Sequence, residues 1–218
     1  MKLFTFWRSL ATFRVRIALN LKGLKPEQVQ VDLIKGDQLL ADYRAVNPQM
    51  VIPALVDGDG PILFQSLAIM EYLDETHPNP PLLPTAPRDR AWVRGLAQIV
   101  ACDSHPLVVP RIRNYLTDEL KLDEATRAKW IRHWVGEALT ALEGHLSRDK
   151  RPGRFCVGER PTIGDICIVS QAVGARLFEV DLKAFPTVAR IVDNCFQIDA
   201  FAAAHPLKQP GAPASGAH

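Results

Sequence analysis

The stretch of sequence that decides the fold runs from Phe6 to Leu24 and reads FWRSLATFRVRIALNLKGL. It overlaps a short apolar segment, Lys2 to Phe6, that has the character of a strand. Ser9 then precedes an amphipathic stretch whose apolar residues fall on one helical face: Phe13, Ile17, Ala18 and Leu21. Gly23 follows where a left-handed C-cap would end a helix. The stretch therefore predicts a strand, a turn that carries a hydroxyl group, and a helix.

The rest of the N-terminal third continues to alternate between strand and helix patterns. Apolar and polar residues alternate from Gln28 to Leu33, as in a half-buried strand, and D-G-D-G-P at 57–61 is a strong hairpin signal. The further predicted elements are a weak helix at Leu39–Val46, strands at Ala54–Val56 and Ile62–Phe64, and a helix at Leu67–Thr76. This order predicts a mixed sheet with helices on its faces, as in a thioredoxin-like α/β domain.

A proline-rich segment separates this part from the rest of the chain. His77–Pro87 holds five prolines, which stop helix propagation and favour an extended connection. The later patterns are helical, most clearly in one apolar stripe: Ile131, Trp134, Val135, Ala138, Leu139, Leu142 and Leu146. Thr162 and Asp165 form a capping box, and Pro186 starts one more short helix. We therefore expect a thioredoxin-like domain at 1–80, a linker at 81–88, an all-helical domain at 89–209 and a disordered tail at 210–218.

Composition excludes several classes of protein. The 218 residues carry a net charge of +2, which argues against a dedicated nucleic-acid surface. No apolar run reaches the ~18 residues of a membrane span, and no secretion signal is visible. The four cysteines are scattered, with no C-x-x-C motif. They fit reduced thiols in a cytoplasmic protein better than disulfides or a metal site, so we expect no metal.

Three separated motifs indicate one binding site. Ser9 lies at a helix start, Ile52 precedes Pro53 in an extended segment, and Gln65-Ser66 opens another helix. Extended segments pair with peptides in strand fashion, and helix starts bind carboxylates. With the hydroxyl, the motifs predict a site for a thiol-containing peptide. The thiol is not the protein's own, because the first cysteine is Cys102, and this disfavours a thioredoxin-type oxidoreductase.

The same motifs resemble those of a known family. FWRS followed by RVRIALNLKG is similar to the signature of zeta-class glutathione transferases, among them bacterial maleylpyruvate and maleylacetoacetate isomerases. Further matching segments follow in the expected order along nearly the whole chain: NPQMVIPAL at 47–55, QSLAIMEYL at 65–73, CDSHPL at 102–107 and RLFEVDL at 176–182. The resemblance implies an all-helical C-terminal domain of the glutathione-transferase type, glutathione as cofactor, and a homodimer.

The resemblance also implies roles toward glutathione. The serine that matches Ser9 donates a hydrogen bond to the glutathione sulfur, although by itself Ser9 reads as a helix cap. Relatives follow this serine with Ser-Cys or Gly-Thr, whereas this chain has Leu10 and Ala11, so Thr12 is a second catalytic candidate. The cofactor-binding candidates are Gln49, Ile52, a cis Pro53, Gln65, Ser66 and His105. The alternatives are a trans proline, a simple N-cap at Ser66, and a helix-end or core histidine.

Two arginines are candidates for holding the substrate. Arg8 and Arg176 match arginines that relatives use against a dicarboxylate, because guanidinium binds a carboxylate in a planar fork. The alternative for each is a solvated surface charge. Relatives carry two asparagines where this chain has Val108-Val109-Pro110, so we expect a drier pocket and a helix break there.

Three functions remain open from the sequence. The first is glutathione-dependent cis–trans isomerisation of a maleyl-type dicarboxylate, in the catabolism of aromatic compounds, by reversible thiolate addition. The second is a broader transferase or an α-haloacid dehalogenase that uses the same thiolate. The third is a transferase-like module that binds a protein partner without catalysis, and the intact Ser9, Pro53, Gln65 and Ser66 count against it.

Overall fold

The computed structural model describes residues 1–213, which form two compact units. The first contains Met1–Leu82 together with the described residues from Ile198 onward, and the second contains Leu83–Gln197. Residues 214–218, part of the predicted disordered tail, lie outside the described residues. Before them the chain makes a turn, in which the Ala212 amide donates to the carbonyl of Gln209 at 3.1 Å.

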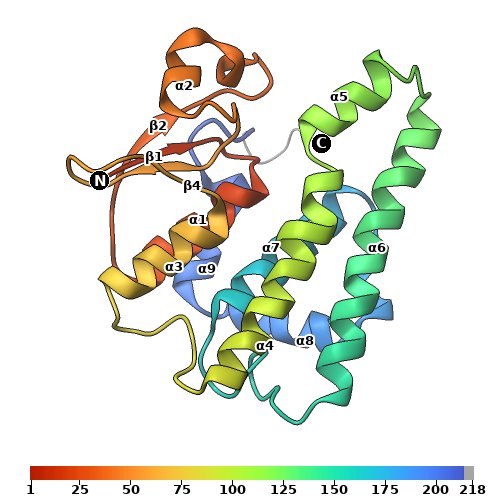
Figure 1. Ribbon diagram of the computed structural model, residues 1–218. Coiled ribbons are helices and arrows are strands. Elements are labelled where there is room, and N and C mark those ends of the chain that lie inside the picture. The colour runs from red at the N-terminus through yellow and green to blue at the C-terminus, as the bar shows by residue number, and fades with distance from the viewer. Residues whose placement is uncertain (214–218) are drawn as a thin grey trace. The chain divides into compact units, whose positions relative to one another are not determined.

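The first unit is built on a four-stranded mixed sheet in the order β2-β1-β3-β4. β1 pairs with β2 in parallel and with β3 antiparallel, and β3 pairs with β4 antiparallel. The elements are β1 Lys2–Thr5, α1 Leu10–Leu21, β2 Glu27–Gln30, a 3-10 turn at Asp37–Leu39, α2 Ala41–Val46, β3 Ala54–Val56, β4 Leu63–Phe64 and α3 Ser66–Thr76. α1 and α3 lie on one side of the sheet and α2 on the other (Figure 1). The predicted thioredoxin-like fold is confirmed.

α1 forms where the sequence predicts it, and its ends show why. Ser9 caps the first turn, and Gly23 follows the last turn with a φ of 68°, which suits glycine. The amide of Leu24 donates to the carbonyl of Leu19 at 2.9 Å, closing the helix in a Schellman-type end. The helix is buried over most of its length, so it forms the centre of this unit.

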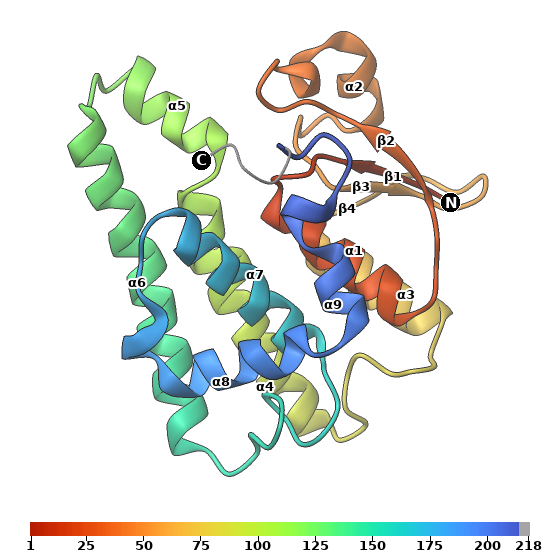
Figure 2. The ribbon, with the colours of Figure 1, turned by 180° about the vertical axis from the view of Figure 1, so that it is seen from behind.

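The last part of the chain belongs to the first unit, which differs from the predicted boundary at residue 209. α9 (Asp199–Ala204) packs beside α1 (Figure 2). Asn20 Nδ2 donates to the carbonyl of Ala200 at 3.0 Å, and the side chain of Phe201 is fully buried. The sequence analysis predicts no helix here, because a six-residue apolar segment carries no pattern that identifies either its structure or the unit on which it packs.

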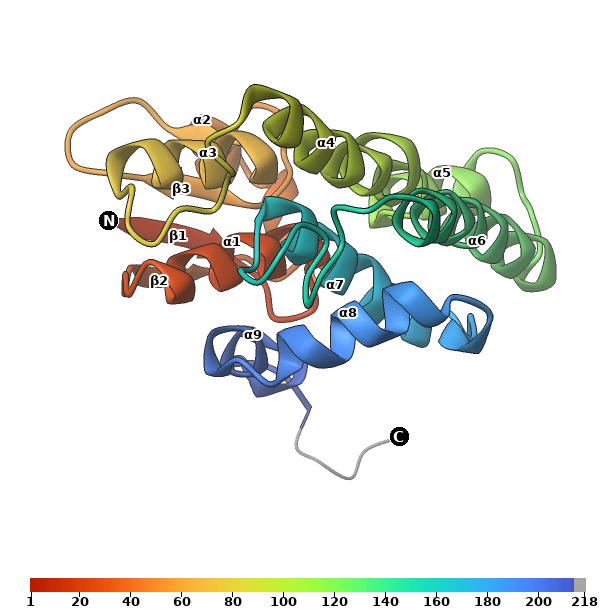
Figure 3. The same cartoon turned by 90° about the horizontal axis from the view of Figure 1, so that it is seen from below.

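The second unit is helical, as predicted. Its elements are α4 Pro87–Gln98, a π-helical turn at Ile99–Ser104, a 3-10 turn at His105–Leu107, α5 Pro110–Asp118, α6 Glu124–Arg148, α7 Ile163–Leu177, a 3-10 turn at Leu182–Ala184 and α8 Pro186–Phe196. α7 lies between α4 and α8 (Figure 3) and is buried from Ile163 to Ala175. Its predicted capping box is present, with the Thr162 amide donating to Asp165 Oδ2 at 2.8 Å.

One expectation for this unit is wrong. Pro110 does not break a helix but begins α5, where the missing amide hydrogen of proline removes no helical hydrogen bond. Val109 is its N-cap residue, and Val108 is buried. α5 therefore starts at the position where we expected an interruption.

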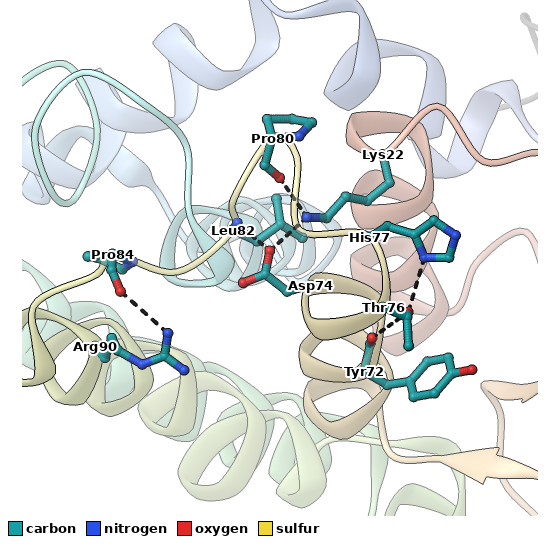
Figure 4. Close-up of polar contacts among 9 residues, drawn as sticks. All are labelled: Lys22, Tyr72, Asp74, Thr76, His77, Pro80, Leu82, Pro84 and Arg90. Carbon is teal, nitrogen blue, oxygen red and sulfur yellow. Dashed lines mark hydrogen bonds and ion pairs between the residues drawn. The ribbon is translucent and has the colours of Figure 1, made fainter.

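The proline-rich connection is held to the first unit by a buried ion pair (Figure 4). Lys22 Nζ donates to Asp74 Oδ1 at 2.7 Å and also to the carbonyl of Pro80. The same carboxylate oxygen accepts from the Leu82 amide at 2.7 Å. Pro87 begins α4, so the helical part starts slightly before the predicted end of the linker at residue 88.

Three findings concern membrane spans, the state of the cysteines and metal binding. No described helix has the length and apolar character needed to cross a membrane. All four cysteines are free thiols, and only Cys102 is exposed. Across residues 1–213, no group of histidine, cysteine or acidic side chains is arranged to hold a metal ion.

Candidate active site

Ser9 is the N-cap of α1, and its hydroxyl is oriented by Thr12. The Ser9 oxygen accepts from the Thr12 amide at 3.2 Å and from the Thr12 hydroxyl at 3.0 Å. A serine oxygen that accepts two hydrogen bonds still has its own hydrogen to donate. Among the described residues no acceptor takes that hydrogen, and Ser9 is only partly buried. The hydroxyl is therefore available to a ligand at the positive end of the helix.

The structure changes the role expected for Thr12. Its side chain is completely buried and donates its hydroxyl hydrogen to Ser9. A buried hydroxyl engaged in this way does not reach a ligand, so Thr12 supports Ser9 instead of replacing it. Leu10 and Ala11 add no polar group to the turn. Ser9 is thus the hydroxyl of the predicted pair that is at least partly accessible.

The segment before β3 offers an open backbone. The Ile52–Pro53 peptide bond is cis, as the resemblance implied. The preceding Val51 carbonyl accepts from the Tyr43 hydroxyl at 2.8 Å and from Asn47 Nδ2 at 2.7 Å, which fixes the segment against α2. Burial raises the pKa of Tyr43 to about 12, so this donor keeps its proton at neutral pH. Among the described residues, no hydrogen bond engages the amide or carbonyl of Ile52, and both can pair with an extended peptide.

The start of α3 has the features of a carboxylate site. In the part of the chain that the structure describes, no side chain caps its first turn, so amide hydrogens remain for an anion. Gln65, just before the helix, has a φ of 69°, a conformation that costs a non-glycine residue about 1–3 kcal/mol. Ser66 is 5% exposed, and its oxygen accepts from Arg14 Nη1 at 3.0 Å. A buried guanidinium thus adds positive charge to the helix start.

Gln49 and Gln65 are linked to each other at the surface. Gln65 Nε2 donates to Gln49 Oε1 at 3.0 Å, and both residues are exposed. Met50, which follows Gln49, has a φ of 55°. The two amide side chains therefore lie close together, as expected if both contact one ligand.

The sheet register brings the three motifs to one edge. Phe4 pairs with Ala54, and Ala54 pairs with Phe64. The turn with Ser9 follows β1, Ile52 precedes the antiparallel β3, and Ser66 follows β4. All three segments therefore leave the sheet at the same end. The arrangement offers a hydroxyl donor, an open strand edge and an anion site, which suits an extended peptide with a thiol and a free carboxylate.

Comparison with known proteins identifies the family. The glutathione S-transferase N-terminal domain family matches residues 3–81. A maleylacetoacetate isomerase of Pseudomonas aeruginosa is 43% identical over 99% of this chain and 100% of its own length. The holo structure of a bacterial zeta-class maleylpyruvate isomerase shares 42% identity, with a TM-score of 0.94, over 98% of this chain and all of that one. The chain belongs to the zeta class of glutathione transferases.

The structure of a third relative contains bound ligands. The crystal structure of a maleylacetoacetate isomerase from Methylobacterium extorquens AM1 contains malonate and glutathione. It is 50% identical to this zeta-class chain, with a TM-score of 0.96, and the match covers 98% of this chain and 100% of that one.

The remaining predicted site residues are distributed over both units. Arg8 is exposed in the turn beside Ser9. Arg176 is exposed in the last turn of α7 and, together with Glu179 and Lys183, lines a hollow of about 490 Å³. His105 begins the 3-10 turn after α4 and is partly buried. Arg176 and His105 belong to the second unit, and their grouping with Ser9 stays a prediction.

Sequence reasoning missed the two buried arginines of α1. Arg14 is 1% exposed and Arg16 is 4% exposed, and burial lowers the pKa of Arg16 to about 9. A signal was present, because both interrupt an otherwise apolar run between Phe13 and Ala18. Charged residues at such positions are rarely buried without polar partners. The supporting hydrogen bonds of Tyr43 and Asn47 had no comparable signal.

Proposed function

We propose that this protein is a glutathione-dependent cis–trans isomerase of a maleyl-type dicarboxylate, either maleylacetoacetate or maleylpyruvate. Full-length similarity to isomerases of both kinds supports the reaction. The observation that carries the proposal is the convergence of Ser9, Ile52 and Ser66 at one sheet edge. These groups match the parts of glutathione, namely its thiol, its cysteinyl backbone and its γ-glutamyl carboxylate.

Each group at the site has a separate role in the proposed reaction. Bound glutathione supplies a thiolate that adds reversibly to the conjugated double bond, so that the bond becomes single, rotates and is restored. The Ser9 hydroxyl donates to the sulfur and favours the thiolate over the thiol. The Ile52 backbone holds the cysteinyl part, and the start of α3 with Ser66 and Arg14 holds the carboxylate. Gln49 and Gln65 contact the exposed side of the peptide.

The dicarboxylate substrate calls for cations. Arg8 adjoins Ser9 and is exposed, and Arg176 is the second candidate. Guanidinium groups match carboxylates in a planar fork and stabilise the charge that develops on the substrate. The malonate bound with glutathione in the Methylobacterium relative supports a dicarboxylate in the family's pocket.

A broader transferase or dehalogenase activity is the second candidate. The observation that favours it is the apolar pair Leu10-Ala11, which leaves Ser9 as the partly accessible hydroxyl in the turn. Val108 and Val109 are apolar where the family resemblance implies amide side chains, and this favours a less polar substrate. A non-catalytic module does not account for the open Ser9 hydroxyl.

The family assignment supports a proposal for the assembly and the location. We propose a homodimer, which light scattering checks, since the mass of one 24.2 kDa chain at micromolar concentration would contradict it. His105 is proposed to lie near the partner subunit. We also propose a cytoplasmic location, where the exposed thiol of Cys102 stays reduced.

Two measurements test the function. Turnover of maleylacetoacetate and of maleylpyruvate is followed with and without glutathione, and we expect formation of the fumaryl product only with it. Calorimetry and thermal unfolding test binding, because glutathione at 100 times its Kd should add ~2.7 kcal/mol to the free energy of unfolding. Binding without turnover of either substrate favours the broader transferase, and absence of binding favours the non-catalytic module.

A further inference from the structure

Arg16 is a buried cation to which the proposed reaction assigns no part. Its guanidinium donates only to neutral oxygens: the Thr5 hydroxyl (3.2 Å) and the carbonyls of Phe6 (3.3 Å), Trp7 (3.2 Å) and Ala204 (3.2 Å). Among the described residues, no carboxylate forms an ion pair with it. A buried charge without a counter-ion costs stability, so its position needs a physical reason.

Three of the four acceptors belong to the segment that leads to Ser9. β1 ends at Thr5, and the carbonyls of Phe6 and Trp7 begin the turn. The Phe6 carbonyl also accepts from the Ser9 amide at 3.1 Å. Arg16 and Ser9 therefore share one acceptor, which limits the distance between Arg16 Nη1 and the Ser9 amide nitrogen to about 6.5 Å.

The fourth acceptor connects the turn to α9. The Ala204 carbonyl ends α9 and accepts from Arg16 Nε. The next residue, His205, packs its ring edge-on against Phe13 at 6.1 Å between centroids, and the Arg16 guanidinium lies 5.9 Å from the same Phe13 ring. Arg16 thus connects β1, α1 and α9 at one point beneath the turn.

The electrostatic effect of Arg16 follows from its burial. Desolvation lowers the pKa of Arg16 to about 9, so the guanidinium stays charged at neutral pH. The other titratable groups on the surrounding elements are Lys2 on β1, Arg8 in the turn, Arg14 on α1, and Asp199 and His205 at the ends of α9. Asp199, the one carboxylate among them, is exposed and makes no contact with Arg16 among the described interactions. A unit charge ~9 Å from a thiol, at an effective dielectric constant of ~20, lowers the thiol pKa by about one unit.

We propose that Arg16 is a positioning residue of the active site, which fixes the turn that carries Ser9 and places a positive charge beneath the glutathione sulfur. The inference rests on the proposed binding of glutathione. It differs from the role of Ser9, which contacts the sulfur directly. Arg16 acts through its hydrogen bonds to the Phe6 and Trp7 carbonyls and through the electric field of its positive charge.

The experiment measures the pKa of the bound glutathione thiol by the ultraviolet absorbance of the thiolate. Arg16→Gln removes the charge and keeps hydrogen-bond donors, whereas Arg16→Lys keeps the charge and loses the fork. We expect a thiol pKa about one unit higher in Arg16→Gln and close to wild type in Arg16→Lys. Val15→Ala, on the same buried helix, is the control that lowers stability without changing the thiol pKa.

Binding of S-methylglutathione separates the possible failures, because it keeps the anchoring groups and has no thiol. We expect its Kd to change by less than about twofold in Arg16→Gln, since the anchors lie at Ile52 and Ser66. An unchanged thiol pKa in an Arg16→Gln protein that still binds S-methylglutathione overturns the proposal. A wild-type protein that binds neither peptide overturns the proposed function and this inference together.

If Arg16→Gln does not fold, Arg16→Lys provides the test. The proposal then expects a nearly normal thiol pKa with turnover at least several-fold lower, because the shorter lysine has a single nitrogen in place of the planar fork whose two Nη atoms hold the Phe6 and Trp7 carbonyls. Wild-type turnover in Arg16→Lys overturns the positioning role.

Discussion

At the residue scale, the turn before α1 is organised around the oxygen of Ser9. Thr12 donates to it twice, once from its amide and once from its hydroxyl. These bonds leave the serine hydrogen free to be donated to a ligand. The free donor, more than the mere presence of a serine, makes thiolate stabilisation possible.

Ser9→Ala should reduce turnover by about 10- to 100-fold and leave the affinity for glutathione nearly unchanged. This loss lies at or below the lower end of the range for oxyanion donors, because a thiolate is larger and softer than an oxyanion. The anchoring contacts at Ile52 and Ser66 are separate from the sulfur. Steady-state kinetics, calorimetry and the thiolate titration check both parts.

Thr12→Val is the companion variant, because it keeps the shape of the side chain and removes its hydroxyl. It should lower turnover only a few-fold, since Ser9 keeps its own hydrogen and loses one of two orienting bonds. Wild-type turnover in Ser9→Ala, with activity abolished in Thr12→Val, would show that Thr12 is the activating group.

The contribution of Tyr43 to the stability of the protein depends on pH in a defined direction. Burial raises its pKa to about 12, so the folded protein holds this proton more tightly than the unfolded chain. The contribution to stability is complete below about pH 10 and is lost as the pH rises toward 12. Two pKa units correspond to at most about 2.7 kcal/mol.

Urea unfolding of wild type and Tyr43→Phe tests this sign. Near pH 8 the variant should be about 1 kcal/mol less stable, because it lacks the hydrogen bond to Val51. The difference should shrink above pH 10 and reverse near pH 12. A difference that stays constant with pH would show that the Tyr43 proton is not held by the fold.

The residue types of the site could be predicted from the sequence, but their environments could not. Ser9, Ile52 and Ser66 stand out because each lies at the end of a recognisable element. The burial of Thr12 depends on tertiary packing, and the Ala204 acceptor of Arg16 depends on the packing of α9 against α1. That contact joins residues 188 positions apart, and no local pattern reports it.

At the element scale, local signals located most helices and strands but not α9, and many of the remaining differences lie at element ends. α1 begins at Leu10, because Ser9 caps it, although its apolar face begins at Phe13. α5 begins at the proline that we expected to break it. Apolar periodicity marks the middle of a helix, whereas caps and backbone geometry decide its ends.

The connection between α3 and α4 depends on one carboxylate (Figure 4). Asp74→Ala should destabilise the protein by about 3–5 kcal/mol, because it leaves the Lys22 ammonium buried without its partner. The Leu82 amide also loses its acceptor. Denaturant unfolding measures the loss.

Two further variants separate the causes. Lys22→Met combined with Asp74→Leu should cost less than Asp74→Ala alone, since no charge is then left buried. Lys2→Ala removes the exposed ion pair with Glu27 and should cost less than about 1 kcal/mol. An Asp74→Ala variant no less stable than Lys2→Ala would contradict a buried, structural ion pair.

At the scale of the whole molecule, the last described residues belong to the same compact unit as the first ones. The first unit is built from residues up to Leu82 and from those after Gln197, so its core combines both ends of the described chain. The sequence predicted the two kinds of unit correctly and misplaced this final segment. Composition and periodicity describe a segment, whereas the unit on which it packs depends on complementary surfaces.

The division of the chain predicts where a core substitution loosens the protein. Phe201 is fully buried in α9, and Phe201→Ala should cost about 3–5 kcal/mol. Val188 is equally buried in α8 of the second unit, and Val188→Ala is the matched control. Hydrogen exchange read by mass spectrometry locates the loosened elements, because local opening raises exchange in the unit that loses its packing. Phe201→Ala should raise exchange in α1 and β1 more than in α6 and α7, and Val188→Ala should do the reverse. If Phe201→Ala instead loosened α6 and α7 and left α1 protected, the last segment would belong to the helical unit, and the support that Ala204 gives to Arg16 would be lost with it.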